Sequence, residues 1–201
     1  NEMLTWKGKH TQSVNNKGVY PRSVQEDFPI WVATGGNTES TIKIAQKGLP
    51  IAYAIIGGQY KAFKGLIDYY RAIGRNAGHS NDRLKVASHS WGFVADTDEE
   101  AIKKYFHPTK QVVDAISKVR PFWRPLTFEQ YLNSVGPDGS MLVGSPETVA
   151  NKLIDMIETL GLDRFMLHLP LGSMPHEDIM KAIKLFGEEV APRVREYFKN
   201  K

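Results

Sequence analysis

The chain has 201 residues, of which 41% are hydrophobic and 24% are charged, as is typical of one globular domain with a substantial core. It contains no cysteine, which excludes a disulfide framework and a thiolate metal site and favours a reducing cytoplasm. The net charge of +4 comes from lysines scattered along helical patterns, so we expect no nucleic-acid partner. No apolar run approaches the roughly 20 residues of a membrane span, and Asn1 begins no secretory pattern, so no membrane association is expected.

The chain divides at about residue 28. Residues 1–28 contain Gly8, Gly18 and Pro21 and show no sustained period of either kind, which predicts an extended lead-in segment along the surface. Residues 29–201 carry the strand and helix patterns. Within them, residues 120–140 are rich in proline and glycine, and we interpret this stretch as an insertion.

Residues 30–50 predict a strand, a tight turn and a helix. Residues 30–33 form a short apolar run, typical of a strand buried on both faces in a parallel sheet. Gly35 and Gly36 allow the backbone to turn sharply and to approach a ligand without a Cβ in the way. Asn37 or Thr38 can then cap the following helix.

Such a turn directs backbone N–H groups and the positive end of a helix dipole toward one spot, where an anion binds well. The hydroxyls of Thr38, Ser40 and Thr41 fall within the first helical turn. The pattern predicts a phosphate site, although a plain chain reversal with an N-cap gives the same local sequence. The expected cofactor-binding residues are Gly35, Gly36, Asn37, Thr38 and Ser40.

Three further strands are expected at residues 51–56, 84–94 and 164–169, each near a helical apolar stripe. A helix begins after Asp96, and Pro108 either interrupts it or starts a second one. Residues 141–144 form a short extended piece before a helix with Pro146 at its first position. Alternating strands and helices predict an α/β fold with a parallel sheet.

Residues 29–50 are similar to the corresponding segment of the bacterial luciferase-like flavin monooxygenases, and the resemblance extends over nearly the whole chain. Further matching pieces lie at residues 6–10, 54–58, 92–97, 143–150 and 185–192. The resemblance implies a (β/α)8 TIM barrel, which needs eight strand-helix units. The four units counted here would be its C-terminal half, with an independent open α/β sheet as the alternative.

The resemblance implies a monooxygenase that uses reduced FMN, supplied by a separate flavin reductase, and O2 to oxygenate a small organic substrate. The fragment alone is expected to be inactive, and either a homo-oligomer or the missing N-terminal half would complete it. Two alternatives stay open. One is a deazaflavin-dependent hydride-transfer oxidoreductase, and the other is a non-catalytic flavin-binding protein.

The resemblance also suggests catalytic and substrate-binding residues. His89 and Trp91 point the same way on one strand, and His168 lies near the carboxyl end of another, so both histidines are candidates for proton transfer. Buried structural histidines are the alternative. Trp91, with Phe122 and Trp123 of the insertion, would contact the substrate, unless the insertion merely packs on the body. No close pair of metal ligands occurs in the sequence, so no metal is expected.

Overall fold

The computed structural model describes residues 3–26 and 28–201, in two compact units. The first unit, residues 1–30, contains an antiparallel pair formed by β1 (Leu4–Trp6) and β2 (Val14–Lys17). The periodicity of the sequence does not predict this hairpin. The second unit, residues 31–201, contains all the helices and the parallel sheet.

The sheet of the second unit is parallel throughout, which confirms the predicted α/β class. Its strands are β3 (Val32–Thr34), β4 (Ile51–Ala54), β5 (Val86–Val94), β6 (Leu142–Gly144) and β7 (Arg164–His168). The long β5 is central: it pairs with β4, with β7, and at its carboxyl end with β6. The four predicted strands therefore lie in the order β3-β4-β5-β7, and the short extended piece at residues 141–144 adds a fifth.

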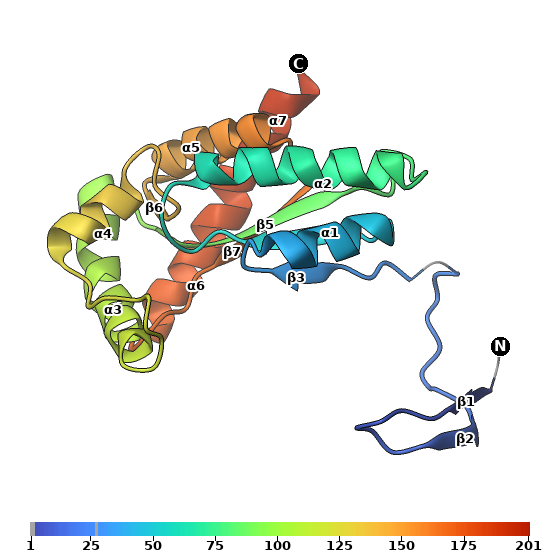
Figure 1. The fold of residues 1–201 in the computed structure, drawn as a ribbon. Helices are drawn as coiled ribbons and strands as arrows, with labels where there is room; N and C mark the ends of the chain where they lie inside the picture. The colour runs from blue at the N-terminus through green and yellow to red at the C-terminus, as the bar shows by residue number, and fades with distance from the viewer. Residues whose placement is uncertain (1–2, 27) are drawn as a thin grey trace. The chain divides into compact units, whose positions relative to one another are not determined.

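Helices follow the strands, as the sequence predicts (Figure 1). They are α1 (Thr38–Gln46), η1 (Tyr60–Phe63), α2 (Lys64–Asn76), α3 (Asp98–Ser117), α4 (Phe128–Val135), α5 (Pro146–Leu160), α6 (His176–Leu185), the π-helical η2 (Phe186–Val190) and α7 (Ala191–Lys199). Four of them begin at a side chain that accepts a backbone N–H, which satisfies part of the unpaired first turn. These caps are Asn37, Thr97, Thr127 and Ser145. None of the helices among the described residues has the length and apolarity needed to cross a membrane.

Alternation along β5 separates two core clusters. Val86 and Val94 belong to a cluster with buried side chains of α1, α2 and α5. Trp91 and Phe93, on the other face, pack with α3 and the insertion. Phe93 stacks on Tyr105 of α3, with ring centroids 5.6 Å apart. Helices α1, α2 and α5 thus cover one face of β5, while α3 and α4 lie near its carboxyl end (Figure 1).

Two predictions about the elements are wrong. The first strand begins only at Val32 and is not buried on both faces: Ile30 lies outside it, 61% exposed, and Ala33 is exposed. Within the described residues, β3 has a neighbouring strand on one side only. Pro108 does not end its helix, because α3 runs on through it. Pro108 is buried there, and the Thr109 hydroxyl donates to the Tyr105 carbonyl at 2.6 Å, which adds a bond within the same turn.

Candidate functional site

The turn after β3 brings two glycines to the start of α1. Gly36 has a φ of +98°, which L side chains rarely adopt, and a Cβ there would lie 3.1 Å from the ring of Phe63. A Cβ on Gly35 would meet no other atom within 4 Å. Gly36 is therefore required by the backbone, whereas Gly35 leaves open space beside the turn.

Asn37 is the N-cap of α1, as the sequence allows. Its Oδ1 accepts the Ser40 N–H at 2.8 Å, and its carbonyl accepts the Thr41 N–H at 3.0 Å. The N–H groups of Thr38 and Glu39 precede the first helical hydrogen bond, so they remain directed out of the helix end. The Ser40 N–H is engaged by the cap, which leaves Ser40 its hydroxyl as a possible ligand group.

The three hydroxyls of this turn have different environments. Thr41 is buried, and its hydroxyl donates to the Asn37 carbonyl at 3.0 Å and lies 3.2 Å from the Tyr53 hydroxyl. Burial raises the pKa of Tyr53 to about 12, which the Thr41 hydrogen bond partly opposes. Among the described residues, the hydroxyls of Thr38 and Ser40 have no hydrogen-bond partner. Thr41 is thus structural, and the other two are available to a ligand.

The charges around the turn suit an anion. The amino end of α1 carries the positive end of the helix dipole. Glu39 is the acidic residue of the first turn, and it forms an ion pair with Lys43 at 2.6 Å. Both side chains are exposed, so this pair adds little stability. It does offset the carboxylate nearest to the turn, which leaves a weakly positive spot bordered by N–H groups.

The structure brings the two candidate histidines together. The Nε2 atom of His89 on β5 lies 3.2 Å from the Nδ1 atom of His168 on β7, and the ring centroids are 5.3 Å apart. Both side chains are half-buried. Burial, and then the proximity of His168, lower the pKa of His89. In a neutral pair one ring donates and the other accepts, so the pair can hold or pass on one proton.

The candidate aromatic residues also line one pocket. Trp91 is only 4% exposed, and the Trp123 ring lies 6.2 Å from it, centroid to centroid, at 48°. Phe122 lines the same pocket but is 95% exposed. The pocket has a volume of about 310 Å³, at the small end of the range for ligand sites. The lining residues that the sequence reasoning missed are Ile56, Gly57, Val113, Arg124, Leu126, Gln130, Ser134 and Met141.

The phosphate loop, the histidine pair and the aromatic pocket lie on different strands. His168 lies in register with Trp91, so the histidine pair and the aromatic pocket adjoin along β5. The phosphate loop follows β3, which is separated from β5 by β4. All three parts lie toward the carboxyl ends of parallel strands, where ligands bind in α/β sheets and barrels.

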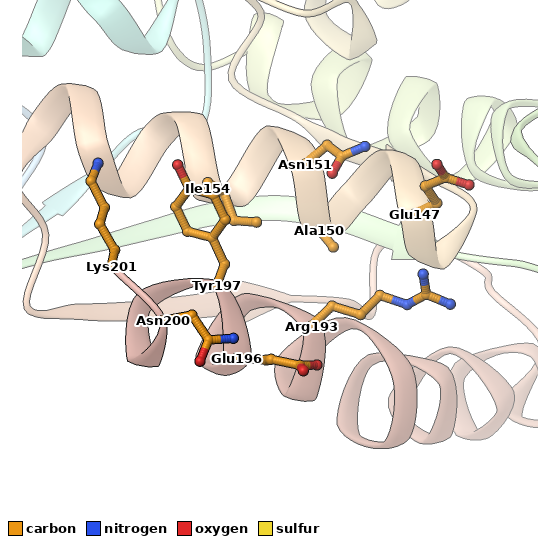
Figure 2. Close-up of a pocket in the computed structure, with 9 residues that line it drawn as sticks. All are labelled: Glu147, Ala150, Asn151, Ile154, Arg193, Glu196, Tyr197, Asn200 and Lys201. Carbon is orange, nitrogen blue, oxygen red and sulfur yellow. The ribbon is translucent and has the colours of Figure 1, made fainter.

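A larger hollow, of about 630 Å³, lies away from these strand ends, between α5 and α7. Figure 2 shows the residues that line it, among them Glu147 and Asn151 on α5 and Arg193 and Glu196 on α7. No strand residue lines this hollow, so we do not associate it with the candidate site. Residues 3–26 and 28–201 contain no group of three or more histidine, cysteine or acidic side chains that could hold a metal ion.

Comparison with known proteins identifies a family and several similar folds. Residues 1–164 match the family model of the luciferase-like monooxygenases. No curated protein sequence matches. Similar folds occur in the monooxygenase RslO1 from Streptomyces bottropensis (TM-score 0.73, 20% identity, 96% of this chain and 56% of that one) and in the coenzyme F420-dependent tetrahydromethanopterin reductase from Methanopyrus kandleri (0.64, 19%, 94% and 58%). A third is the oxygenating constituent of 3,6-diketocamphane monooxygenase from Pseudomonas putida, in complex with FMN (0.54, 19%, 96% and 58%). The chain spans just over half the length of these structures.

Proposed function

Because this chain belongs to the luciferase-like monooxygenase family, we propose that it is the C-terminal, phosphate-binding half of a flavin-dependent monooxygenase. The complete enzyme would use reduced FMN and O2 to oxygenate a small organic substrate. The observation that carries the proposal is the turn at Gly35 and Gly36, where the first N–H groups of α1 and two unpartnered hydroxyls meet. The absence of cysteine supports a reducing, cytoplasmic compartment.

The residues of the turn fit the FMN phosphate. Open space beside Gly35 would admit the phosphate, and the N–H groups of Thr38 and Glu39 would donate to it. The hydroxyls of Thr38 and Ser40 would add two more donors. A hydrogen bond to a charged group contributes about 1.5–3 kcal/mol, so the loss of any one of these donors should weaken phosphate binding measurably.

The other residues of the site would act on the substrate end. Bound reduced flavin, renewed by a separate flavin reductase, would supply electrons to dioxygen. Trp91 and Trp123 would hold an apolar part of the substrate and exclude water. His89 and His168 would hold one proton between Nε2 and Nδ1 and pass it on within the site. Burial and the neighbouring His168 lower the pKa of His89, which favours its neutral form.

A deazaflavin is the second candidate cofactor. The F420-dependent reductase has the same identity to this chain as the FMN-bound monooxygenase, 19%, and a higher TM-score, 0.64 against 0.54. Deazaflavin chemistry transfers hydride and needs no oxygen, so turnover under strict anaerobiosis with a deazaflavin as the only redox partner would exclude the monooxygenase proposal. Oxygen uptake with reduced FMN and substrate would support it. Flavin binding without either reaction would indicate a non-catalytic flavin carrier.

The Ser40→Ala variant tests the phosphate site. In the complete enzyme we expect it to weaken FMN binding by about 1–3 kcal/mol, since a donor to a charged group is lost. Riboflavin, which lacks the phosphate, should bind equally to both proteins. Thr41→Val is the matched control: it removes the adjacent hydroxyl that already bonds within the protein, and it should leave the ratio of FMN to riboflavin affinity unchanged. If Ser40→Ala weakened the binding of FMN and riboflavin equally, the phosphate would have to bind elsewhere.

We also propose that the missing half of the barrel, rather than a second copy, completes the sheet. Within the described residues, β3 and β7 each have one unpaired edge. The Arg164 guanidinium reaches to 5.0 Å from the Trp31 ring, beside the in-register alanines Ala52 and Ala87. No carboxylate of the described residues pairs with Arg164. A two-fold partner would bring a second Arg164 to the same interface, whereas a different half can bring an acid.

Dilution distinguishes these possibilities for the isolated chain. We expect light scattering to show concentration-dependent association without a defined dimer, and flavin titration to show weak binding. A stoichiometric dimer would favour the second copy. A stable monomer with tight, stoichiometric flavin binding would contradict the half-barrel proposal, because the sheet would then be self-sufficient.

A further inference from the structure

The side chain of Lys152 is hydrogen-bonded to three backbone carbonyls. It lies on α5 with its side chain half-buried. Its Nζ atom donates to the carbonyls of Val135 at 2.9 Å, Gly136 at 2.6 Å and Met141 at 2.6 Å. An ammonium group has three N–H donors, so each donor has one carbonyl. Among the described residues no carboxylate lies within ion-pair distance of it.

One of the three carbonyls, that of Met141, belongs to a residue that lines the aromatic pocket, whereas Val135 and Gly136 line the neighbouring hollow together with Lys152. Val135 and Gly136 end α4, where the last carbonyls lack helical partners. Met141 lines the pocket, as does Ser134, and the Met141 N–H donates to the Ser134 carbonyl at 2.9 Å. Lys152 therefore binds both ends of the loop that connects α4 to β6, and this loop carries Met141 into the pocket wall.

The same loop is also tied to the turn that follows β4. The Ser140 N–H donates to the Gly58 carbonyl at 3.0 Å, and Lys61 forms an ion pair with Asp138 at 2.6 Å. Gly57, in that turn, lines the aromatic pocket. A displacement of residues 135–141 would thus move two sides of the pocket together.

We propose that Lys152 is a positioning residue for the substrate pocket, which it holds in shape by fixing the carbonyls of Val135, Gly136 and Met141. The proposal rests on the proposed function only in assigning substrate to the pocket of Trp91 and Trp123. Lys152 does not line that pocket, so it acts through the α4–β6 loop.

The carboxylates nearest to Lys152 have other partners. Asp98 and Asp155 line the hollow beside it, and Asp138 lies on the connecting loop. Asp98 accepts from Ser145 N–H and the Thr148 hydroxyl, and Asp155 accepts from Tyr60, so each has another partner.

Burial lowers the pKa of Lys152 to about 8, with Asp138 acting weakly in the opposite direction. An opening that exposes Lys152 to water returns its pKa to its ordinary value, near 10.4. The open form therefore binds more protons between about pH 8 and 10. Raising the pH through this window is therefore expected to favour the closed pocket wall, because burial of the charge costs more than the one N–H donor that the neutral amine lacks.

Lys110 provides a matched control at the other end of the insertion. Its Nζ atom donates to the Leu126 carbonyl at 2.9 Å and to Asp114 at 2.8 Å. Lys110 thus also holds a carbonyl of the insertion, but a carboxylate neutralises it. Lys110→Met should loosen the backbone before α4, at Leu126. It should not change the pH dependence of amide protection after α4.

Two readouts that require no flavin test the proposal. The first is amide exchange of residues 128–141, expressed relative to the unstructured rate at each pH. In the wild-type chain and in Lys110→Met we expect this protection to rise between pH 8 and 9.5, by at most about tenfold per pH unit. In Lys152→Met it should be lower than in wild type at pH 7 and independent of pH. The second readout is the exciton circular-dichroism signal of Trp91 and Trp123, which should weaken in Lys152→Met only.

A Lys152→Met variant with unchanged protection at pH 7 and an unchanged indole signal would overturn the proposal. If Lys152→Met does not fold, Lys152→Gln, whose amide keeps two N–H donors, takes its place: a partial loss of protection is expected, and unchanged protection would overturn the proposal. A failure of flavin to bind would refute the proposed function and leave both readouts intact.

Discussion

The phosphate loop and the aromatic pocket are built in opposite ways. The loop consists of the contiguous residues 35–40, and its conformation follows from two glycines and one cap. The pocket and the adjoining histidine pair join β5 to residues of the insertion and of β7, with His89 and His168 79 positions apart. A local site depends on single backbone positions, whereas an assembled site depends on the packing of whole elements.

Substitution of Gly36 should give the largest effect and would test the local half of this comparison. Gly36→Ala forces a side chain into a positive-φ conformation and against the Phe63 ring, so we expect a loss of about 1–3 kcal/mol in the free energy of unfolding. Gly35→Ala is the control, since its Cβ meets open space. Chemical denaturation measures both variants. Equal losses would show that the turn does not depend on the positive φ.

Asn37 separates stability from ligand binding within the loop. Asn37→Ala removes the cap bond to the Ser40 N–H, which should cost about 1 kcal/mol of unfolding free energy. Asn37→Asp can keep that bond but places a negative charge beside the phosphate site. We expect the aspartate variant to melt near the wild-type temperature and, in the complete enzyme, to bind FMN more weakly while riboflavin binding is retained. Unchanged FMN affinity in this variant would argue against an anion at the turn.

The histidine pair should make stability depend on pH. The folded pKa of His89 is lowered by burial and then by His168, while the unfolded value is about 6.5. As the pH falls through that value, the unfolded chain binds a proton that the folded chain does not, so the free energy of unfolding falls. His89→Gln should flatten this slope between pH 7.5 and 5.5 in urea titrations. Substitution of the exposed His107 by Gln should leave it in place.

The insertion should show the smallest effect. Phe122 is almost fully exposed, so Phe122→Ala should change the free energy of unfolding by no more than about 0.5 kcal/mol. Trp123→Ala should cost more, because it removes the contact with Trp91. Thermal melts of the two variants provide the measurement. A larger loss of unfolding free energy in Phe122→Ala than in Trp123→Ala would mean that Phe122, and not Trp123, packs in the pocket.

Local chemistry made much of the fold predictable. The helix starts after Asp96 and at Pro146, and a cap at Asn37 or Thr38, were predictable because a helix start depends on side chains within about three residues of it. The wrong predictions concern what surrounds an element. An apolar run such as residues 30–33 does not indicate how many neighbouring strands it has. Pro108 lacks the N–H of other residues, but packing along α3 holds the helix across it.

The sequence by itself determined the parallel α/β class, the Gly-Gly turn and its cap, since each depends on the period or on bonds between near neighbours. It also placed His89 and Trp91 on one face of a strand, by simple alternation. Only the tertiary structure decided that His168 meets His89, that Trp123 reaches Trp91 while Phe122 faces solvent, and that Lys152 collects three carbonyls. The physical reason is that strand order and loop docking bring together residues far apart in the chain, and no local pattern records the distance between them.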